Sequence, residues 1–393
     1  MISKKMEQNL ANSSFIRAMF EEGEKLRKQF GADNVYDFSL GNPDNPPQPK
    51  VKETLKNLVL EDKPNMHAYM SNAGYPNVRE KVAIYIKKES GVSLGSENII
   101  MTCGAAAALN VTFKALLDPD DEVIVLAPYF VEYLFYIDNH GGKPVIVSTK
   151  KDTFEPDPEE LEKHLTKRTK AIILNTPNNP TGVVYSEQVL SEIAKVLESA
   201  EKKFGTTIYV LSDEPYNKIT YDNVKVPNMM KLFKNAIILN SFSKSLALPG
   251  ERIGYIAISS NIDDYINVSD AMVFANRTLG FVNAPALFQK VIAEALEEKV
   301  DNTLYKQRRD MLYNHLTSLG FTCAKPQGAF YLFPKALIAD DVEFKNRALK
   351  YNLIIVPGSG FGCPGYFRLA YCVSPKMVEA SLPAFTALAK EFK

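Results

Sequence analysis

The sequence predicts an α/β protein with a large domain, built on a mostly parallel sheet between two layers of helices, and a smaller α+β domain. Three observations lead to this prediction. From about residue 98, short and uniformly apolar segments alternate with helical segments, which is typical of buried parallel strands. After about residue 284 the pattern changes to helices followed by a few short strands. The chain has 393 residues, which is long enough for two domains.

The first fifty residues contain a predicted helix and then an extended segment. Residues 13–30 carry apolar side chains near helical spacing, with charged residues between them. Residues 35–49 include four prolines within seven positions, which excludes a helix interior. We therefore place a boundary here. Residues 47–284 are predicted to form the large domain, and residues 1–46 are predicted to join residues 285–393 in the small domain.

The predicted strands of the large domain are separated by helical segments such as S-E-Q-V-L-S-E-I-A-K-V-L. The strands read N-I-I-M-T, E-V-I-V-L, P-V-I-V-S, K-A-I-I-L-N, T-I-Y-V-L, A-I-I-L-N and I-G-Y-I-A-I. Open parallel sheets bind ligands beyond the carboxyl ends of their strands. We therefore expect the functional site among the polar residues that follow these strands.

The C-terminal part of the chain predicts α+β structure. Its apolar patterns indicate helices at 285–298, 301–319 and 376–391, and strands near 328–333, 353–356 and 366–371.

The composition excludes several classes of protein. Lys+Arg and Asp+Glu are equal at 46 each, so the net charge indicates neither a nucleic-acid nor a membrane partner. The four cysteines form no C-x-x-C motif, so neither a zinc site nor a disulfide framework is expected. The N-terminus lacks the apolar core of a signal peptide, and no apolar run is long enough to span a bilayer. We expect a cytoplasmic protein.

Three of the turns that follow predicted strands could bind a planar, phosphorylated ligand. Gly104 lies in T-C-G-A-A, where a helix begins and its free N–H groups suit a phosphate, although an ordinary strand–helix turn explains the motif equally well. Phe130 lies in A-P-Y-F-V-E-Y, where an aromatic ring either stacks on a ligand or packs in the core. Asn179 lies in N-T-P-N-N-P-T-G and adds an amide at the same edge; turn chemistry alone could explain the asparagine, but not so much polarity directly after a buried strand.

Charged residues follow two further strands. Asp213 in S-D-E-P-Y ends a buried strand, so it either caps a helix or pairs with a cationic ring nitrogen. Lys244 in S-F-S-K lies eight residues before Arg252. A neighbouring cation and desolvation would lower its pKa and make the amine nucleophilic, whereas an exposed loop lysine is the alternative. Arg368 in Y-F-R-L-A-Y suits either a bound carboxylate or a structural ion pair.

Together and in this order, the motifs resemble those of the class I/II aminotransferases, pyridoxal-phosphate enzymes of the aspartate aminotransferase fold type. The resemblance covers nearly the whole chain. It rests on L-G-N-P (40–43), Y-x4-G-Y-P (69–76), the turn at Gly104, N-N-P-T-G, S-D-E-P-Y, S-F-S-K with Arg252, Q-G-A-F-Y (327–331), P-G-S-G-F-G (357–362) and F-R-L-A-Y. It implies a seven-stranded sheet, the cofactor pyridoxal 5'-phosphate, and transfer of an amino group between an L-amino acid and a 2-oxo acid, with 2-oxoglutarate as the expected acceptor.

The resemblance also implies roles for single residues around the cofactor ring. Lys244 would form the internal aldimine and later move a proton between the substrate Cα and the cofactor C4′, on the way to pyridoxamine phosphate. Asp213 would keep the ring nitrogen protonated. Tyr216 and Asn179 would hydrogen-bond the phenolic oxygen of the ring, and Phe130 would stack on its face.

The resemblance further implies how the phosphate and the substrate are bound. The phosphate would be held by the turn at Gly104 and by Ala105, Ala106, Ser241 and Arg252. Tyr69 would reach the phosphate of a neighbouring subunit, which implies a homodimer with shared active sites. Arg368, Asn179 and the segment at Gly41 and Asn42 would bind the substrate α-carboxylate.

The preferred amino acid stays open. Aspartate needs a second cation, and the two positions where relatives carry one hold Phe274, in F-A-N, and Ala106 here. Arg277 or Arg17 could substitute; otherwise aromatic, alanine-like or other neutral amino acids are open. Two alternatives share the fold: a C–S or β-lyase, and a non-catalytic cofactor-binding regulator. The regulator is the less expected one, because the chain is not basic and begins almost directly at its first helix.

Overall fold

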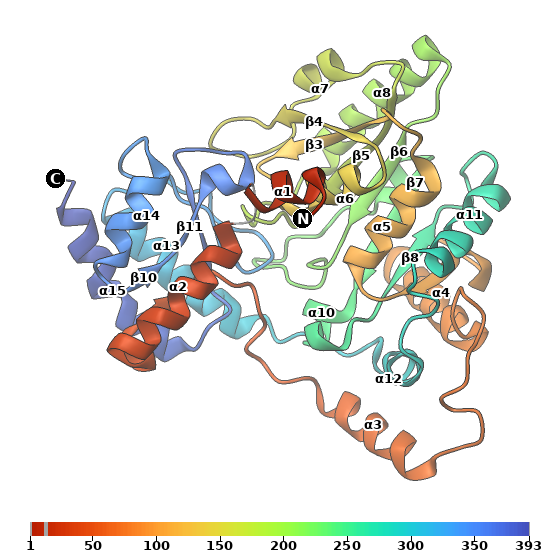
Figure 1. Cartoon of the computed structure of the whole chain (residues 1–393), viewed down its shortest axis with the longest axis horizontal. Coiled ribbons are helices and arrows are strands. Elements are labelled where there is room, and N and C mark those ends of the chain that lie inside the picture. The colour runs from red at the N-terminus through yellow and green to blue at the C-terminus, as the bar shows by residue number, and fades with distance from the viewer. Residues whose placement is uncertain (1, 12–14, 393) are drawn as a thin grey trace.

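The computed structural model describes residues 2–11 and 15–392 and arranges them in two lobes (Figure 1). The larger lobe carries a seven-stranded sheet. The smaller lobe carries a three-stranded antiparallel sheet and one pair of parallel strands. None of the described helices is both long enough and apolar enough to cross a membrane.

The large sheet has the strand order β2-β8-β7-β6-β5-β3-β4. Only β8 runs antiparallel to its neighbours, so the sheet is mostly parallel, as the sequence predicts. The strands are β2 (Ile99–Thr102), β3 (Glu122–Ala127), β4 (Lys143–Ser148), β5 (Thr169–Asn175), β6 (Tyr209–Asp213), β7 (Ala236–Ser241) and β8 (Gly254–Ile258).

Helices cover both faces of this sheet, which explains why its strands are apolar on both sides. Consecutive strand residues such as Ile172 and Ile173 belong to two separate hydrophobic cores, one on each face of the sheet. The core on one face includes α4 and α8, and the core on the other includes α5 and α11. The helices of this lobe are α3 (Pro49–Glu61), α4 (Pro76–Ser90), α5 (Ala105–Leu116), α6 (Glu132–Asn139), α7 (Pro158–His164), α8 (Glu187–Phe204), α9 (Met229–Leu232), α10 (Phe242–Ser245), α11 (Tyr265–Thr278) and α12 (Ala286–Ala295).

The smaller lobe encloses a third hydrophobic core. Its antiparallel sheet has the order β11-β12-β9, and β1 pairs in parallel with β10. The strands are β1 (Tyr36–Asp37), β9 (Tyr331–Leu332), β10 (Leu353–Ile354), β11 (Val356–Pro357) and β12 (Phe367–Ala370). The helices are α2 (Phe15–Phe30), α13 (Thr303–Ser318), α14 (Asp341–Leu349) and α15 (Pro375–Lys390).

Helix α1 (Lys4–Ala11) lies in front of the gap between the two lobes in the view of Figure 1. Lys5 attaches it to the end of α6 through Asp138, with Nζ 2.8 Å from Oδ2 and 2.6 Å from the main-chain oxygen. The N-terminal segment is therefore connected to the lobe that carries the large sheet.

Most differences from the predicted elements are at their ends. The helix predicted at 13–30 is described from residue 15; residues 13 and 14 lie outside the described part. The strand predicted at 328–333 is wrong in length, because only Tyr331–Leu332 pair with β12. The preceding residues form a sharp corner, where Ala329 has a φ of +54°.

Candidate active site

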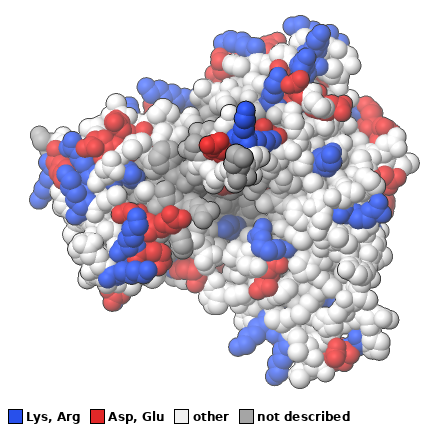
Figure 2. Space-filling model, in the orientation of Figure 1, with Lys and Arg blue, Asp and Glu red and all other residues white. Residues whose placement is uncertain are grey.

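A cavity of about 270 Å³ lies beyond the carboxyl ends of β5, β6 and β7, facing the smaller lobe. Most of the predicted site residues line it, although they come from distant parts of the chain. They are Gly41, Ala105, Ala106, Phe130, Asn179, Asp213, Tyr216, Ser241, Lys244, Arg252 and Arg368. Figure 2 shows a hollow between the lobes on this face, and the charged side chains around it are of both signs.

Lys244 lies in α10, the short helix that follows β7. Its Nζ donates a hydrogen bond to the main-chain oxygen of Gly41 at 2.6 Å. Burial lowers the pKa of Lys244, the positive charges of Arg368 and Arg252 act in the same direction, and the resulting value is about 8. A larger fraction of this amine is therefore neutral near pH 7 than of an exposed lysine, which is what a nucleophile requires.

Asp213 is the last residue of β6, and its carboxylate is buried. Tyr133 donates a short hydrogen bond to Oδ2, whereas Oδ1 has no hydrogen-bond partner in the structure. Burial raises the pKa of Asp213 to about 6, and the hydrogen bond from Tyr133 opposes this rise. A turn follows β6 rather than a helix, so Asp213 is not a helix cap. A protonated ring nitrogen would satisfy the free oxygen.

Arg368 lies in β12 and is buried, which lowers its pKa. Its Nη1 donates to Oδ1 of Asn179 at 3.1 Å, and Nη2 donates to the main-chain oxygen of Ser39. Its Nε has no partner, and no carboxylate lies within ion-pair distance among the described residues. The structure therefore does not support a structural ion pair, and it leaves the guanidinium free to bind a carboxylate from outside.

The two phenols nearest this arginine form a pair. The hydroxyl of Tyr216 lies 2.8 Å from that of Tyr331, whose ring faces the Arg368 guanidinium at 4.8 Å. Tyr331 was not among the predicted site residues, although it belongs to the Q-G-A-F-Y motif. Its position depends on the pairing of β9 with β12, which brings together residues far apart in the sequence.

The N-terminus of α5 forms a cradle of N–H groups next to a cation. Gly104 has a φ of +84°, and a side chain there would place its Cβ 2.7 Å from Nη2 of Arg252. Glycine therefore permits the close approach of the guanidinium to the helix end. Ser241, which is buried at the end of β7, also lines the cavity. Helix N-termini and arginines both favour phosphate, so this part of the cavity fits the phosphate of the cofactor.

Besides Tyr331, two further residues that support the cavity were not predicted from the sequence. Tyr133 is the last residue of the A-P-Y-F-V-E-Y motif, and its hydroxyl reaches Asp213. Asn175 donates from Nδ2 to the main-chain oxygen of Asp213 at 2.9 Å and accepts at 2.8 Å from the N–H of Asn179. It ends a buried strand next to a predicted turn, and that position was the available signal.

Tyr69, which was predicted at the subunit contact, and Phe274 and Arg277, which were considered for the second substrate carboxylate, lie outside the cavity. Tyr69 is 92% exposed and Phe274 is 58% exposed. The Arg277 guanidinium lies 5.0 Å from the ring of Phe274. The side chain of Arg17 lies outside the described part of the structure. None of these residues therefore supplies a cation to the cavity within the described part of one chain.

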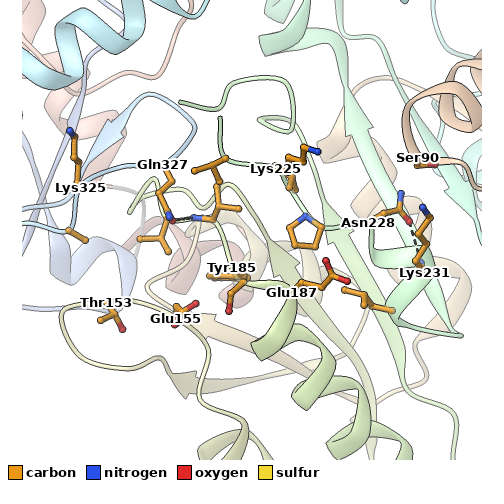
Figure 3. Close-up of a pocket in the computed structure, with 18 of the residues that line it drawn as sticks. Ser90, Thr153, Glu155, Tyr185, Glu187, Lys225, Asn228, Lys231, Lys325 and Gln327 are labelled. Atoms are coloured by element: carbon orange, nitrogen blue, oxygen red, sulfur yellow. Dashed lines mark hydrogen bonds between the residues drawn. The ribbon is translucent and has the colours of Figure 1, made fainter. Parts of the chain in front are cut away.

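A second and larger hollow, of about 730 Å³, contains none of the predicted site residues (Figure 3). It lies between Tyr185 and Glu187, near the start of α8, and the segment with Lys225 and Asn228, with Gln327 from the loop before β9. Its lysines and glutamates are spread around the wall and are not directed at one point (Figure 3). We therefore assign the chemistry to the smaller cavity.

The fold and the residues that line the smaller cavity are those of an enzyme class that uses pyridoxal phosphate. A family comparison identifies the class more closely: residues 33–385 match the model for "Aminotransferase class I and II", and the chain belongs to this family. It is a pyridoxal-phosphate-dependent aminotransferase, which confirms the predicted fold, enzyme class and cofactor. The regulator and lyase alternatives receive no support from these comparisons.

Relatives with different stated substrates resemble the chain almost equally. An aspartate/prephenate aminotransferase of Thermus thermophilus is 34% identical over 366 residues, which cover 92% of each chain. A probable N-acetyl-LL-diaminopimelate aminotransferase of Bacillus subtilis is 34% identical, covering 89% of this chain and 88% of its own. A solved aminotransferase of Eubacterium rectale superposes with a TM-score of 0.96 at 40% identity over the full length of both chains. The family is therefore clear, whereas the substrate is not.

Proposed function

We propose that this aminotransferase acts on a neutral L-amino acid, with Lys244 as its proton-transferring amine. One observation carries the proposal. A single cavity holds a lysine whose pKa is lowered to about 8, a buried Asp213 oxygen without a partner, and a buried arginine whose Nε is free. The lysine can supply the reacting amine, the aspartate can bind a cationic ring nitrogen, and the arginine can bind an α-carboxylate.

The bound cofactor supplies an electrophilic carbon and a protonated ring that accepts electrons from the substrate Cα. Asp213 would bind the ring nitrogen, and its charge would hold the proton there. Tyr216 and Asn179 would donate to the phenolic oxygen of the ring, and Phe130 would pack on its face. The neutral Nζ of Lys244 would remove the proton from the substrate Cα and deliver it to the cofactor carbon C4′.

The anions would be bound at opposite ends of the cavity. Ser241, Arg252 and the start of α5 at Gly104, Ala105 and Ala106 would hold the phosphate. Arg368 would bind the substrate α-carboxylate, with the Asn179 side chain fixing its Nη1 and the main chain at Gly41 lying close by. This arrangement would leave the substrate side chain directed toward the mouth.

The proposal of a neutral donor rests on the charges in the cavity. Its described lining contains four charged residues: Asp213, Lys244, Arg252 and Arg368. Each already has a partner in the proposed arrangement, so no cation remains for a second carboxylate. The lining also includes apolar and aromatic side chains, namely Leu40, Leu109, Phe130 and Tyr136.

We also propose a homodimer in which Tyr69 reaches the phosphate of the neighbouring subunit. Tyr69 is 92% exposed and Ile266 is 70% exposed in the single chain, which suits residues that another chain covers. The division into residues 47–284 and the two flanking segments stays our proposal for the domains. Helix α12, within the segment 285–393, packs on α3 and α4 of the larger lobe.

The decisive experiment is Lys244→Ala, with Lys231→Ala as a control outside the cavity. Lys244→Ala should abolish turnover and the absorbance of the lysine-bound cofactor, whereas Lys231→Ala should keep both. The preferred donor is then identified by mixing the holoenzyme with each of a panel of amino acids and following the rapid change in absorbance. Aspartate reacting faster than neutral amino acids would contradict the substrate proposal. Release of pyruvate and ammonia would indicate a lyase instead.

A further inference from the structure

Two neighbouring aromatic residues contact three groups of the proposed site. The ring of Phe330 lies 5.6 Å from Nζ of Lys244. The hydroxyl of Tyr331 lies 2.8 Å from that of Tyr216, and its ring faces the guanidinium of Arg368 at 4.8 Å. Both aromatic residues are buried. Of these contacts, the one between Tyr331 and Arg368 bears on substrate binding, so the placement of this short segment sets how the carboxylate-binding arginine is held.

The main chain just before these rings adopts a conformation that needs support. Ala329 has a φ of +54°, in the left-handed region that residues other than glycine rarely occupy. Such a conformation persists only where the surrounding structure holds it. The N–H of Ala329 donates to the main-chain oxygen of Ile219 at 2.9 Å. Its carbonyl accepts a hydrogen bond from the hydroxyl of Tyr221, and the hydroxyl of Tyr371 lies 3.3 Å from the same oxygen.

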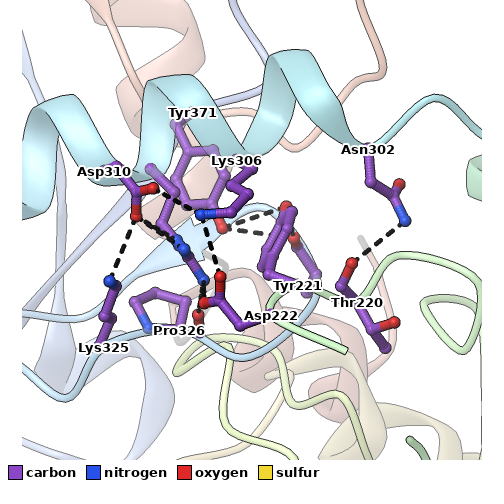
Figure 4. Close-up of polar contacts among 11 residues, drawn as sticks. Thr220, Tyr221, Asp222, Asn302, Lys306, Asp310, Lys325, Pro326 and Tyr371 are labelled. Atoms are coloured by element: carbon purple, nitrogen blue, oxygen red, sulfur yellow. Dashed lines mark hydrogen bonds and ion pairs between the residues drawn. The ribbon is translucent and has the colours of Figure 1, made fainter. Parts of the chain in front are cut away.

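The two supporting phenols are themselves held in place. Their hydroxyls lie 3.3 Å apart, and burial raises the pKa of both, so each stays a neutral donor. The guanidinium of Arg309 lies 4.7 Å from the ring of Tyr221 and bonds Asp222 at 2.8 Å and Asp310 at 2.7 Å. Figure 4 shows Tyr221 and Tyr371 side by side, next to these two carboxylates.

We propose that Tyr221 and Tyr371 are positioning residues for substrate binding. Neither lines the cavity, so neither contacts the cofactor or the amino acid. Their hydroxyls hold the carbonyl of Ala329, and this contact fixes Tyr331 against Arg368. The inference rests on the role proposed above for Arg368. Because an arginine that binds a carboxylate acts equally in the ground state and the transition state, loosening it raises KM and leaves kcat almost unchanged.

The test uses the holoenzyme with Tyr221→Phe, Tyr371→Phe and the double variant. The control is Tyr366→Phe, which removes a phenol bonded to Asp152 at 2.7 Å, away from the cavity. Three quantities are measured: KM and kcat for the preferred amino acid, the Kd of propionate from the change in cofactor absorbance, and the urea midpoint. Propionate carries the carboxylate without an amino group, so its Kd reports on Arg368 without turnover.

The double variant should raise both KM and the propionate Kd about tenfold and change kcat by less than about twofold. The control variant should have a lower urea midpoint and an unchanged KM and propionate Kd. If both constants of the double variant stay within about twofold of the native values, the positioning role is wrong, whatever happens to stability. If the double variant fails to fold, Tyr371→Phe decides, with an expected rise of about threefold. Arg368→Lys separates the two proposals, because an unchanged propionate Kd in that variant would refute the role of Arg368 itself.

Discussion

Replacing Asp213 by asparagine should stabilise the cofactor-free protein at neutral pH. Burial raises the pKa of Asp213 from 3.8 to about 6. One pKa unit corresponds to about 1.4 kcal/mol, so the ionised carboxylate destabilises the folded state by about 3 kcal/mol. Asparagine keeps the acceptor for Tyr133 but leaves an amide N–H without a partner, which costs about 1–2 kcal/mol. The free energy of unfolding should therefore rise by about 1–2 kcal/mol at about pH 7.5.

The gain in unfolding free energy should depend on pH, and the direction of that dependence follows from the raised pKa of Asp213. Because the pKa of Asp213 is higher in the folded state, the folded protein binds more protons than the unfolded protein between about pH 3.8 and 6. Native stability therefore falls as the pH rises through this window, and the advantage of the variant grows in it. Burial also raises the pKa of Glu214 to about 7, but this residue is present in both proteins and its contribution largely cancels in the difference.

Urea unfolding of the cofactor-free native and variant proteins at about pH 4 and about pH 7.5 measures the effect. Asp222→Asn is a control of opposite sign, because Arg309 and Lys306 lower the pKa of Asp222 to about 2. That variant should lose stability at the higher pH. An Asp213→Asn difference that is equal at the two pH values would refute the reasoning. Cofactor should stabilise the native protein more than the Asp213→Asn variant, because only the native protein offers an anion to the ring nitrogen.

Three further predictions concern other groups of the cavity. In the cofactor-free protein, the rate of Lys244 acylation should increase up to about pH 8 and then level off, because burial lowers the pKa of this amine to about 8. Mapping of the modified peptide at several pH values measures the rate. A rate that still rises well above pH 8 would contradict the prediction. Gly104→Ala should weaken cofactor binding at least about tenfold, because the new Cβ would lie 2.7 Å from Nη2 of Arg252 and the backbone there has a φ of +84°. Equilibrium dialysis measures the Kd of the cofactor, and an unchanged Kd would contradict the prediction. Arg368→Lys should lower kcat/KM by about a hundredfold through loss of the planar fork; steady-state kinetics check it, and a loss below about threefold would show that another group binds the carboxylate.

The large sheet could be predicted from the sequence because each of its strands is a continuous apolar run. Polar residues then stand out at the strand ends, and Asp213 and Lys244 are both found there. These signals are local: each needs only a strand and the turn after it. The same locality explains why α12 is difficult to assign to a lobe from sequence, since its packing against α3 depends on distant residues.

The rest of the site could not be predicted because it depends on long-range pairing. Tyr331 reaches Arg368 only through the register of β9 and β12, in which Tyr331 lies opposite Ala370. Tyr133 bonds a carboxylate 80 residues away. The two-residue strand β1 has no apolar run to reveal it, because it consists of Tyr36–Asp37. In each case the sequence contains the residue but not its partner.

The antiparallel direction of β8 has a consequence for the order in which the chain assembles. Because β8 returns directly alongside β7, the segment between them carries both Lys244 and Arg252, which are eight residues apart. By contrast, the contact of Arg368 with Ser39 spans 329 residues. Contacts that close short loops form sooner than contacts that close long ones. The chain can therefore bring Lys244 and Arg252 together while the anchor for the substrate carboxylate still awaits the last strand.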